Sequence, residues 1–404
     1  MPRPKETSVS PLGRPATAIH MLALQIQEYL YFPTPDPLYA VLGALCGNVL
    51  KGPPVWLMLV GVPASGRTVL LETLQDIPKV HTVSAIRSPA ALLSGVARKD
   101  VTKGATGGLL QQVGSKGGML VMKDFTGMLS LPRDPLAEVV GAFREIYDGH
   151  WSRPLGTDGG RVLHWWGKLG FIGACTPAID QHHKSIGELG QRWMYYRYGH
   201  SDGWGETRTV MATVDPEEVR KKLQGLVLEF FEMTGLDWSG GCVDRRALDD
   251  KESNRVFALA SLAAAARSTV ARDWRTREVV EVPFKEAPTR LAGALGQLYL
   301  GLEVIGLDER ERWRVVGKVA MDSMPAGRLK VVERLRVSGG VTGRELEGVL
   351  KCSAGTVRYV CEDLEIHGVV ERVEKGGGRM GERVGSWGLS EWAKSTIGVG
   401  WSAI

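Results

Sequence analysis

An apolar run that leads directly into a glycine-bounded loop constrains this chain more than any other stretch. Residues 55–60 are all apolar, and the following Gly61 and Gly66 bracket four residues before Arg67 and Thr68. This spacing matches G-x-x-x-x-G-K-[ST], in which glycines let backbone N–H groups curl around phosphate oxygens and the hydroxyl reaches Mg²⁺, except that arginine replaces lysine. We predict a strand, a phosphate-binding loop and a helix; a plain strand–turn–helix is the alternative. The expected nucleotide-lining residues are Gly61, Pro63, Ala64, Ser65, Gly66, Arg67, Thr68 and Val69.

Length and composition predict a globular protein of two or three domains. The chain has 404 residues, of which 44% are hydrophobic, enough for packed cores. Its 50 basic and 45 acidic residues give a net charge of +5, which permits contact with nucleic acid without requiring it. The five cysteines never occur in C-x-x-C spacing, so neither a disulfide framework nor zinc is indicated. Without a run of about 18 apolar residues or a signal peptide, we expect a cytoplasmic protein with no membrane contact.

Breaks in the hydrophobic pattern divide the chain into four parts. We expect a disordered tail over residues 1–16 and a helical lead-in with the nucleotide core over residues 17–225. A helical subdomain follows over residues 226–325, and a winged-helix domain with a tail occupies residues 326–404.

A second apolar strand, over residues 119–125, carries the charged pair Lys123-Asp124 near its end. A carboxylate at the C-terminal end of a parallel strand would face the phosphate loop and hold Mg²⁺. Thr68 and Asp124 are therefore the predicted metal-binding residues. If the register instead aligns on Phe125, Asp124 takes the water-orienting position and Lys123 the metal position. A strand capped by a surface Lys–Asp pair is the structural alternative.

Three further residues are candidates for acting on a bound phosphate. Thr176 ends the apolar strand over residues 169–175, where a hydroxyl can sense a phosphate or position water, although threonine before proline also simply ends strands. Arg192 precedes an aromatic strand and is a candidate finger for a neighbour's nucleotide, because a planar guanidinium stabilises a transferring phosphoryl group. Arg290 stands at a helix start, from which it would swing onto phosphate. A surface salt bridge for Arg192 and an ordinary helical role for Arg290 are the alternatives.

Two regions are candidates for binding DNA. Residues 153–166 predict a β-hairpin with Arg153 and Arg161 near its tip, as either a DNA contact or a structural hairpin. Residues 328–389 predict helix, helix, turn, helix and hairpin, the order of a winged helix-turn-helix, which binds either DNA or protein. The candidate DNA-binding residues of this second region are Thr356, Arg358 and Tyr359 on the helix and Lys375, Arg379 and Arg383 on the wing.

The order of these features resembles the AAA+ ATPases, in particular minichromosome-maintenance helicases and helicase-like ATPases of phages and plasmids. The resemblance covers about residues 38–389 and implies an α/β P-loop NTPase core, a helical lid and a C-terminal winged helix. It also implies an oligomeric ring or helix with ATP bound between subunits, on which Arg192 and Arg290 act. The chain departs from the pattern of these ATPases at two positions that bear on ATP hydrolysis. Arg67 replaces the loop lysine, and Asp124 is not followed by a glutamate.

These features support an ATP-binding, DNA-associated motor or loader that serves replication of a mobile element. A nucleotide-switched DNA-binding regulator with little hydrolysis is the alternative, and a scaffold with a structural nucleotide is a third possibility. An arginine can bind phosphate yet misplace the transition state, so binding is a firmer expectation than hydrolysis.

Overall fold

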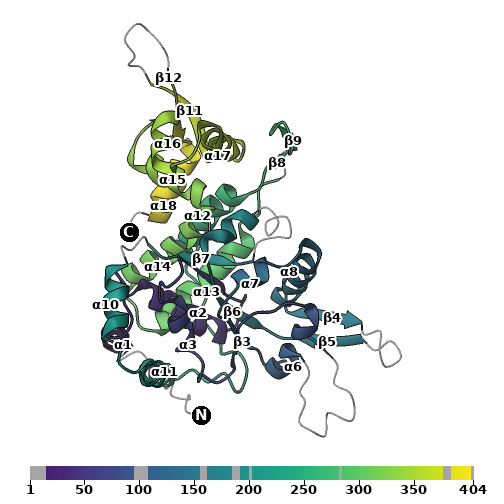
Figure 1. The fold of residues 1–404 in the computed structure, drawn as a ribbon, viewed down its shortest axis with the longest axis vertical. Coiled ribbons are helices and arrows are strands. Elements are labelled where there is room, and N and C mark those ends of the chain that lie inside the picture. The colour runs from purple at the N-terminus through teal and green to yellow at the C-terminus, as the bar shows by residue number, and fades with distance from the viewer. Residues whose placement is uncertain are drawn as a thin grey trace, which may run out of the picture.

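The computed structural model has a mixed α/β fold built on a central five-stranded parallel sheet (Figure 1). The structure describes residues 15–94, 108–154, 162–183, 192–199, 203–281, 284–375 and 384–401. Most of the predicted tail over residues 1–16 lies outside these ranges. No helix in the described ranges is both long and apolar enough to cross a membrane.

The strands of the central sheet run in the order β2-β3-β6-β1-β7, and every neighbouring pair is parallel. Their bounds are β1 Trp56–Val60, β2 Val80–Val83, β3 Gly118–Met122, β6 Leu169–Cys175 and β7 Met194–Arg197. The chain leaves β1 toward β2 at one edge and leaves β6 toward β7 at the other edge. In open parallel sheets, such a reversal creates a crevice at the C-terminal ends of the strands, where ligands bind.

Successive side chains along the strands of the sheet pack into two separate hydrophobic cores, one on each face. Leu57 and Leu59 of β1 belong to one cluster of buried side chains, whereas Trp56 and Met58 belong to the other. A strand turns successive side chains to opposite faces, so a continuous apolar run is buried only when helices cover both faces. The predicted buried strand is confirmed and forms the middle layer of an α/β/α arrangement.

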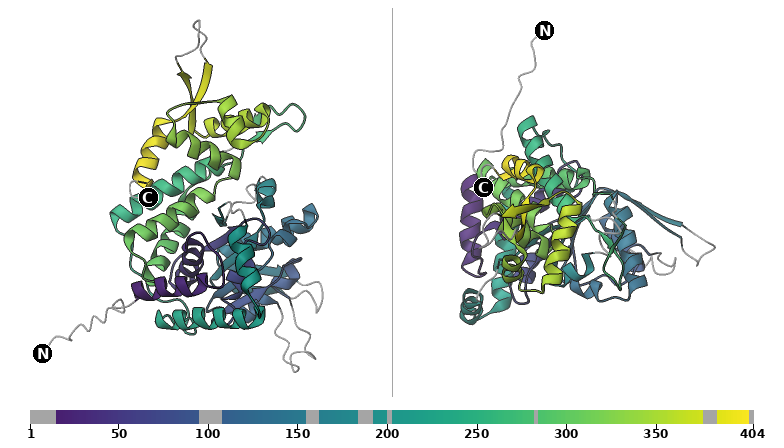
Figure 2. Two further views of the ribbon diagram at one scale, coloured as in Figure 1. Left: turned by 60° about the vertical axis from the view of Figure 1, so that its left-hand side comes forward. Right: turned by 90° about the horizontal axis from the view of Figure 1, so that it is seen from above.

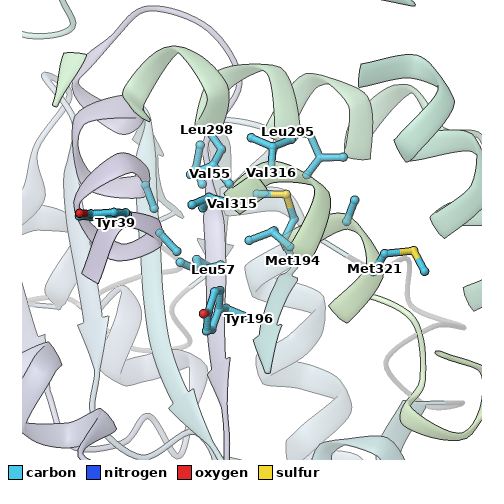
Figure 3. Packing of buried hydrophobic residues seen from close by; sticks show 14 of the residues in the cluster. Tyr39, Val55, Leu57, Met194, Tyr196, Leu295, Leu298, Val315, Val316 and Met321 are labelled. Atoms are coloured by element: carbon cyan, nitrogen blue, oxygen red, sulfur yellow. The ribbon is translucent and has the colours of Figure 1, made fainter. Parts of the chain in front are cut away.

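The first face is covered by helices from distant parts of the sequence (Figure 3). Helices α2 (Asp36–Val49), α13 (Thr289–Val304) and α14 (Glu309–Asp322) pack there, with α1 (Pro15–Gln27) nearby. The backbones of α2 and α13 approach closely, because a Cβ on Gly301 would collide with the carbonyl oxygen of Gly43. Asp322 of α14 also accepts a 2.6 Å hydrogen bond from the backbone N–H of Arg197 in β7.

The second face is covered by segments between β2 and β6. Helices α4 (Pro89–Leu92), α6 (Leu109–Val113), α7 (Thr126–Leu129) and α8 (Arg133–Tyr147) lie here, with the hairpin of β4 (His150–Pro154) and β5 (Val162–Trp166). The predicted hairpin is confirmed and pairs Ser152 with His164. Trp56 is fully buried and packs its ring against Phe143, Phe171 and Trp193.

The green helices α12, α13 and α14 lie between the central sheet and the C-terminal unit (Figure 2). After β7 come α10 (Trp204–Ala212), α11 (Pro216–Met233), α12 (Asp250–Arg267) and the short pair β8 (Ala271–Arg272) and β9 (Val279–Glu281). The C-terminal unit contains α15 (Ala326–Val337), β10 (Val341–Thr342), α16 (Gly343–Leu350), α17 (Ala354–Ile366), β11 (Val370–Lys375), β12 (Val384–Leu389) and α18 (Glu391–Trp401).

The predicted order of helices and strands in the C-terminal unit agrees with the structure, although helix α18 was not predicted. Thr342 and Glu345 have the spacing of a capping box and form one at the start of α16, and Ser353 accepts a hydrogen bond from the backbone N–H of Thr356 at the start of α17. Each such cap satisfies a backbone donor that the first helical turn leaves free.

The burial of His183 leads us to expect that the folded protein loses stability in mild acid. His183 follows the 3-10 helix η1 (Pro177–His182), and its Nε2 lies 2.8 Å from the carbonyl oxygen of Arg267. Burial lowers the pKa of His183 from 6.5 to about 4, and the cation of Arg328 acts in the same direction. The hydrogen bond to the Arg267 carbonyl and the charge of Asp180 oppose this shift. Because the unfolded chain binds this proton more tightly, the stabilisation is complete above pH 6.5 and is lost as the pH falls toward 4.

We expect the free energy of unfolding to fall by about 1–3 kcal/mol across this window, measured by urea denaturation at several pH values. His183→Gln should flatten that part of the profile. An unchanged profile in this variant would assign the acid sensitivity to other groups.

Candidate nucleotide site

The loop between β1 and α3 (Arg67–Glu72) has the tight backbone that the glycine spacing predicted. Ala64 and Gly66 both have positive φ, of 64° and 75°. At Gly66 a side chain would also meet Leu30, whose Cδ1 lies 2.7 Å from the position of a Cβ. Gly66 is therefore required both by its backbone conformation and by the close packing of Leu30.

Arg67 turns its guanidinium inward across the loop. Its Nη2 donates to the carbonyl oxygen of Val62 at 2.9 Å, its Nε to the hydroxyl of Ser65 at 2.9 Å, and its Nη1 to the carbonyl oxygen of Cys175. Burial lowers the pKa of Arg67, while Tyr198, Cys175 and Asp124 nearby oppose that shift. The side chain therefore ties the loop after β1 to the end of β6, at the crevice where the strand order reverses.

Asp124 and Thr176 lie at this same C-terminal end of the sheet. Asp124 follows β3 and accepts a 3.2 Å hydrogen bond from the backbone N–H of Gly127, and its charge acts on Arg67. The hydroxyl of Thr126 accepts a 3.0 Å bond from the backbone N–H of Thr176 and lies 3.4 Å from the Thr176 hydroxyl. The structure thus gathers the loop, Asp124 and Thr176 at one end of the sheet.

Lys123 and Glu72 are engaged with each other. Lys123 Nζ lies 3.0 Å from one carboxylate oxygen of Glu72, and Arg220 Nε lies 2.9 Å from the other oxygen. Phe125 is fully buried among aromatic rings. Asp124 instead is exposed, and its charge acts on Arg67 of the loop. No cluster of three or more His, Cys, Asp or Glu side chains with metal-binding geometry occurs in the same ranges.

A mostly apolar cavity of about 360 Å³ opens beside the loop. It lies between the segment after α1, the start of α3, and helices α10 and α11. Its lining includes Tyr29, Tyr31, Thr68, Val69, Val210 and Val219. A second cavity of about 400 Å³ shares Tyr31, Ala64, Ser65 and Glu206 with the first and adds Tyr198 and Lys318.

The predicted loop residues 64–69 line the first cavity, whereas the cavity residues outside the loop were not predicted. Tyr29 and Tyr31 follow the end of α1 at Gln27, so two aromatic residues close to a helix end were a usable sequence signal. Tyr198 and Lys318 were not discoverable in this way, because residues 120 positions apart reach the loop only through packing of α14 on β7.

Arg192 and Arg290 lie at the opposite end of the sheet from the loop of the same chain. Arg192 lies two residues before Met194, which pairs with Leu57 near the start of β1, so about 20 Å of strand separates Arg192 from Gly61. Its side chain is only 3% exposed and lies 3.2 Å from the Asp148 carboxylate. Burial lowers the pKa of Arg192, and Arg290 and Arg144 lower it further through their charges. These two arginines therefore lie away from the loop of their own chain.

The candidate DNA-binding residues are dispersed. Arg153 donates a 2.8 Å hydrogen bond to the carbonyl oxygen of Leu93. Thr356 and Arg358 are exposed on α17, where Tyr359 lies with its ring 5.0 Å from the Arg358 guanidinium and 4.8 Å from that of Arg272. Lys375 ends β11. The side chains that lie outside the described residues are Arg161, Lys375, Arg379 and Arg383.

Fold and site together define an α/β protein whose parallel sheet and glycine loop are compatible with a P-loop or Rossmann-like nucleotide-binding core. No protein-family model matches the chain, and no curated protein matches it. Among solved structures it is similar to an apo A-form structure of the NrS-1 C-terminal region, at 12% identity and a TM-score of 0.31, over 96% of this chain and 79% of that one. A second structure of that region, residues 305–718, matches over the same shares at 11% identity and a TM-score of 0.29. Similarity this distant says nothing about activity.

Proposed function

We propose that the chain binds ATP and Mg²⁺ beside the loop, as an oligomeric DNA-associated protein of the AAA+ type that serves replication of a mobile element. The observation that carries the nucleotide part is the placement of the glycine loop and inward-turned Arg67 in the crevice between β1 and β6, next to the 360 Å³ cavity. Ligand sites are usually cavities of about 300–1,000 Å³ lined by apolar groups with a few polar ones.

The residues present fit a phosphorylated ligand. Tyr198 lies against the loop, since a Cβ on Gly61 would be 3.2 Å from that of Tyr198. The Tyr198 hydroxyl is buried and has no hydrogen-bond partner within the described part of the chain. Leaving a buried hydroxyl unpaired is costly, and a ligand oxygen would satisfy it.

Each residue then has a role in binding. The loop N–H groups and Arg67 bind phosphate, Thr68 and Asp124 hold Mg²⁺, and Tyr29, Tyr31 and Val69 cover the base and ribose. Bound Mg²⁺ supplies positive charge that neutralises the phosphates. Thr176 positions an outer phosphate oxygen. Arg192 and Arg290 lie far from the loop of their own chain, so their role in this proposal is toward the nucleotide of a neighbouring subunit, for which Arg192 has to leave its buried pairing with Asp148.

Val219→Asp tests the nucleotide proposal. A carboxylate in the cavity repels the ligand's phosphates, so we expect the affinity for ATP, measured by calorimetry, to fall about tenfold or more. Val337→Asp, at an exposed position on α15, is the matched control. Wild-type protein that binds no ATP at micromolar concentrations would refute the proposal, and an unchanged affinity in Val219→Asp would place the nucleotide elsewhere.

The DNA part of the proposal rests on the order α15, α16, α17, β11 and β12, which is that of a winged helix with α17 as its recognition helix. Arg358→Gln should weaken duplex binding and reduce the slope of log K against log salt by about one, because one phosphate contact is lost. Fluorescence anisotropy over a salt series measures both effects, with the exposed Arg310→Gln on α14 as control. An unchanged slope would indicate that this surface binds protein instead.

The alternative function is a DNA-binding regulator that ATP switches without rapid hydrolysis. Arg67 favours it, because a broad guanidinium fixed by three acceptors is poorly suited to follow a transferring phosphoryl group. Footprints that ATP alters, in protein that shows no turnover with or without DNA, would support the regulator over the motor.

A further inference from the structure

The β8–β9 hairpin projects from the molecule beside α17, the proposed recognition helix, and β11 and β12 lie on the other side of that helix (Figure 1 and Figure 2). A two-stranded hairpin is only marginally stable by itself, so it depends on contacts with another element. The Arg272 guanidinium lies 3.1 Å from the carboxylate of Glu362 and 2.8 Å from that of Asp363, both on α17. It also lies 4.8 Å from the centre of the Tyr359 ring. Arg272 therefore holds the hairpin against the helix that the proposed function places on DNA.

The tip of the hairpin is a turn fixed by its own hydrogen bonds. One carboxylate oxygen of Asp273 accepts hydrogen bonds of 2.7 Å from the backbone N–H groups of Arg275 and Thr276. The backbone N–H of Arg277 donates to the carbonyl oxygen of Asp273 at 3.0 Å. Arg272 Nη1 donates to the carbonyl oxygen of Arg277, also at 3.0 Å. The arginine that attaches the hairpin to α17 thus also stabilises its turn.

This turn presents a tryptophan and two arginines to solvent. The Trp274 side chain is 81% exposed, and Arg275 and Arg277 are exposed as well. An aromatic ring beside cations is the combination that binds single-stranded nucleic acid, because any base can stack on the ring while the cations attract the phosphates. The tip of the hairpin has this combination on a conformation that is already fixed.

The charges of the hairpin are balanced overall but not at its tip. Residues 272–281 contain three arginines and three carboxylates, namely Arg272, Arg275, Arg277, Asp273, Glu278 and Glu281. Arg272 is paired with α17, and the Asp273 carboxylate accepts backbone N–H groups of the turn. Residues 274–277 therefore carry two cations and no carboxylate, while Glu278 and Glu281 follow on the returning side. A negatively charged strand is attracted to the tip and repelled from the returning side.

We propose that the tip of the β8–β9 hairpin binds single-stranded DNA at the point where it leaves a duplex held by α17. Trp274 stacks on an unpaired base, and Arg275 and Arg277 face the phosphates of that strand. This inference rests on the proposed binding of duplex DNA by α17. It adds a preference for a junction between duplex and single strand, because a recognition helix by itself reads a groove of the duplex.

Trp274→Ala tests the stacking contact. Wild type should bind a duplex with a single-stranded thymidine tail about tenfold more tightly than the blunt duplex, measured by fluorescence anisotropy. Trp274→Ala should bind both DNAs equally, with its affinity for the blunt duplex unchanged. Trp204→Ala, at a position that is 70% exposed on α10, should keep the wild-type preference.

The outcomes of this experiment separate the two proposals. If wild type binds both DNAs equally, or if Trp274→Ala keeps the preference for the tailed duplex, the hairpin proposal alone is wrong. If wild type binds neither DNA, the duplex-binding function of α17 is refuted together with it.

The charges of the tip provide an independent test. Arg275→Gln/Arg277→Gln should reduce the slope of log K against log salt for the tailed duplex by about 1.4, since each phosphate contact on a single strand contributes about 0.7. Glu278→Gln removes a neighbouring carboxylate and should tighten binding of the tailed duplex about twofold. Neither change should alter binding of the blunt duplex. An equal effect on the blunt duplex would show that duplex DNA lies at the tip and would overturn the proposal.

Discussion

Arg67→Ala is expected to lower the affinity for ATP about 100-fold. The substitution removes the guanidinium proposed to bind phosphate and leaves the Val62 carbonyl, the Ser65 hydroxyl and the Cys175 carbonyl without their shared donor. Hydrogen bonds to a charged group contribute about 1.5–3 kcal/mol, so a loss of about 3 kcal/mol in binding is reasonable. Calorimetric titration with ATP measures the effect. The exposed Arg208→Ala on α10 controls for removing an arginine.

Arg67→Lys separates binding from turnover. An ammonium is a compact point charge on a flexible stem, whereas a guanidinium is planar and broad, so we expect the lysine variant to retain ATP binding. A rise in hydrolysis would show that Arg67 is what slows the wild-type site. Absence of hydrolysis in both proteins, with and without DNA, would rule out the motor. Unchanged affinity in Arg67→Ala would assign the guanidinium a purely structural role between the loop and β6.

Trp56→Ala should destabilise the fold by about 3–5 kcal/mol, because it leaves a large cavity beside the central sheet. The indole is fully buried, contacts Phe143, Tyr147, Phe171 and Trp193, and donates a 2.7 Å hydrogen bond from Nε1 to the carbonyl oxygen of Leu169. Urea denaturation followed by near-UV circular dichroism measures the loss.

Trp56→Phe is the matched variant. It keeps most of the packing but leaves the Leu169 carbonyl without its donor, so we expect a smaller loss of about 1–2 kcal/mol. Equal losses in the two variants would mean that the hydrogen bond, rather than ring packing, dominates at this position.

The local elements were largely predictable. The apolar run before Gly61 predicted a strand and the glycine spacing a tight loop, and the structure has β1 in the middle of the sheet and Gly66 at a positive φ. The Thr342–Glu345 capping box fixed the start of α16. These features depend on neighbours within a few residues, where steric hindrance and backbone hydrogen bonding decide the conformation. Helix ends are harder to predict: the helical pattern after the loop continues to about Gln75, whereas α3 ends at Glu72.

The sequence by itself determined the strand–loop–helix, the hairpin and the caps, because each is set by local sterics and hydrogen bonds. It left open which side chains meet. Only the tertiary structure turned Arg67 onto the end of β6, paired Lys123 with Glu72, and set Arg192 at the end of the sheet away from the loop. Those contacts join segments tens of residues or more apart, and strand order and helix packing, which no local spacing encodes, bring them together.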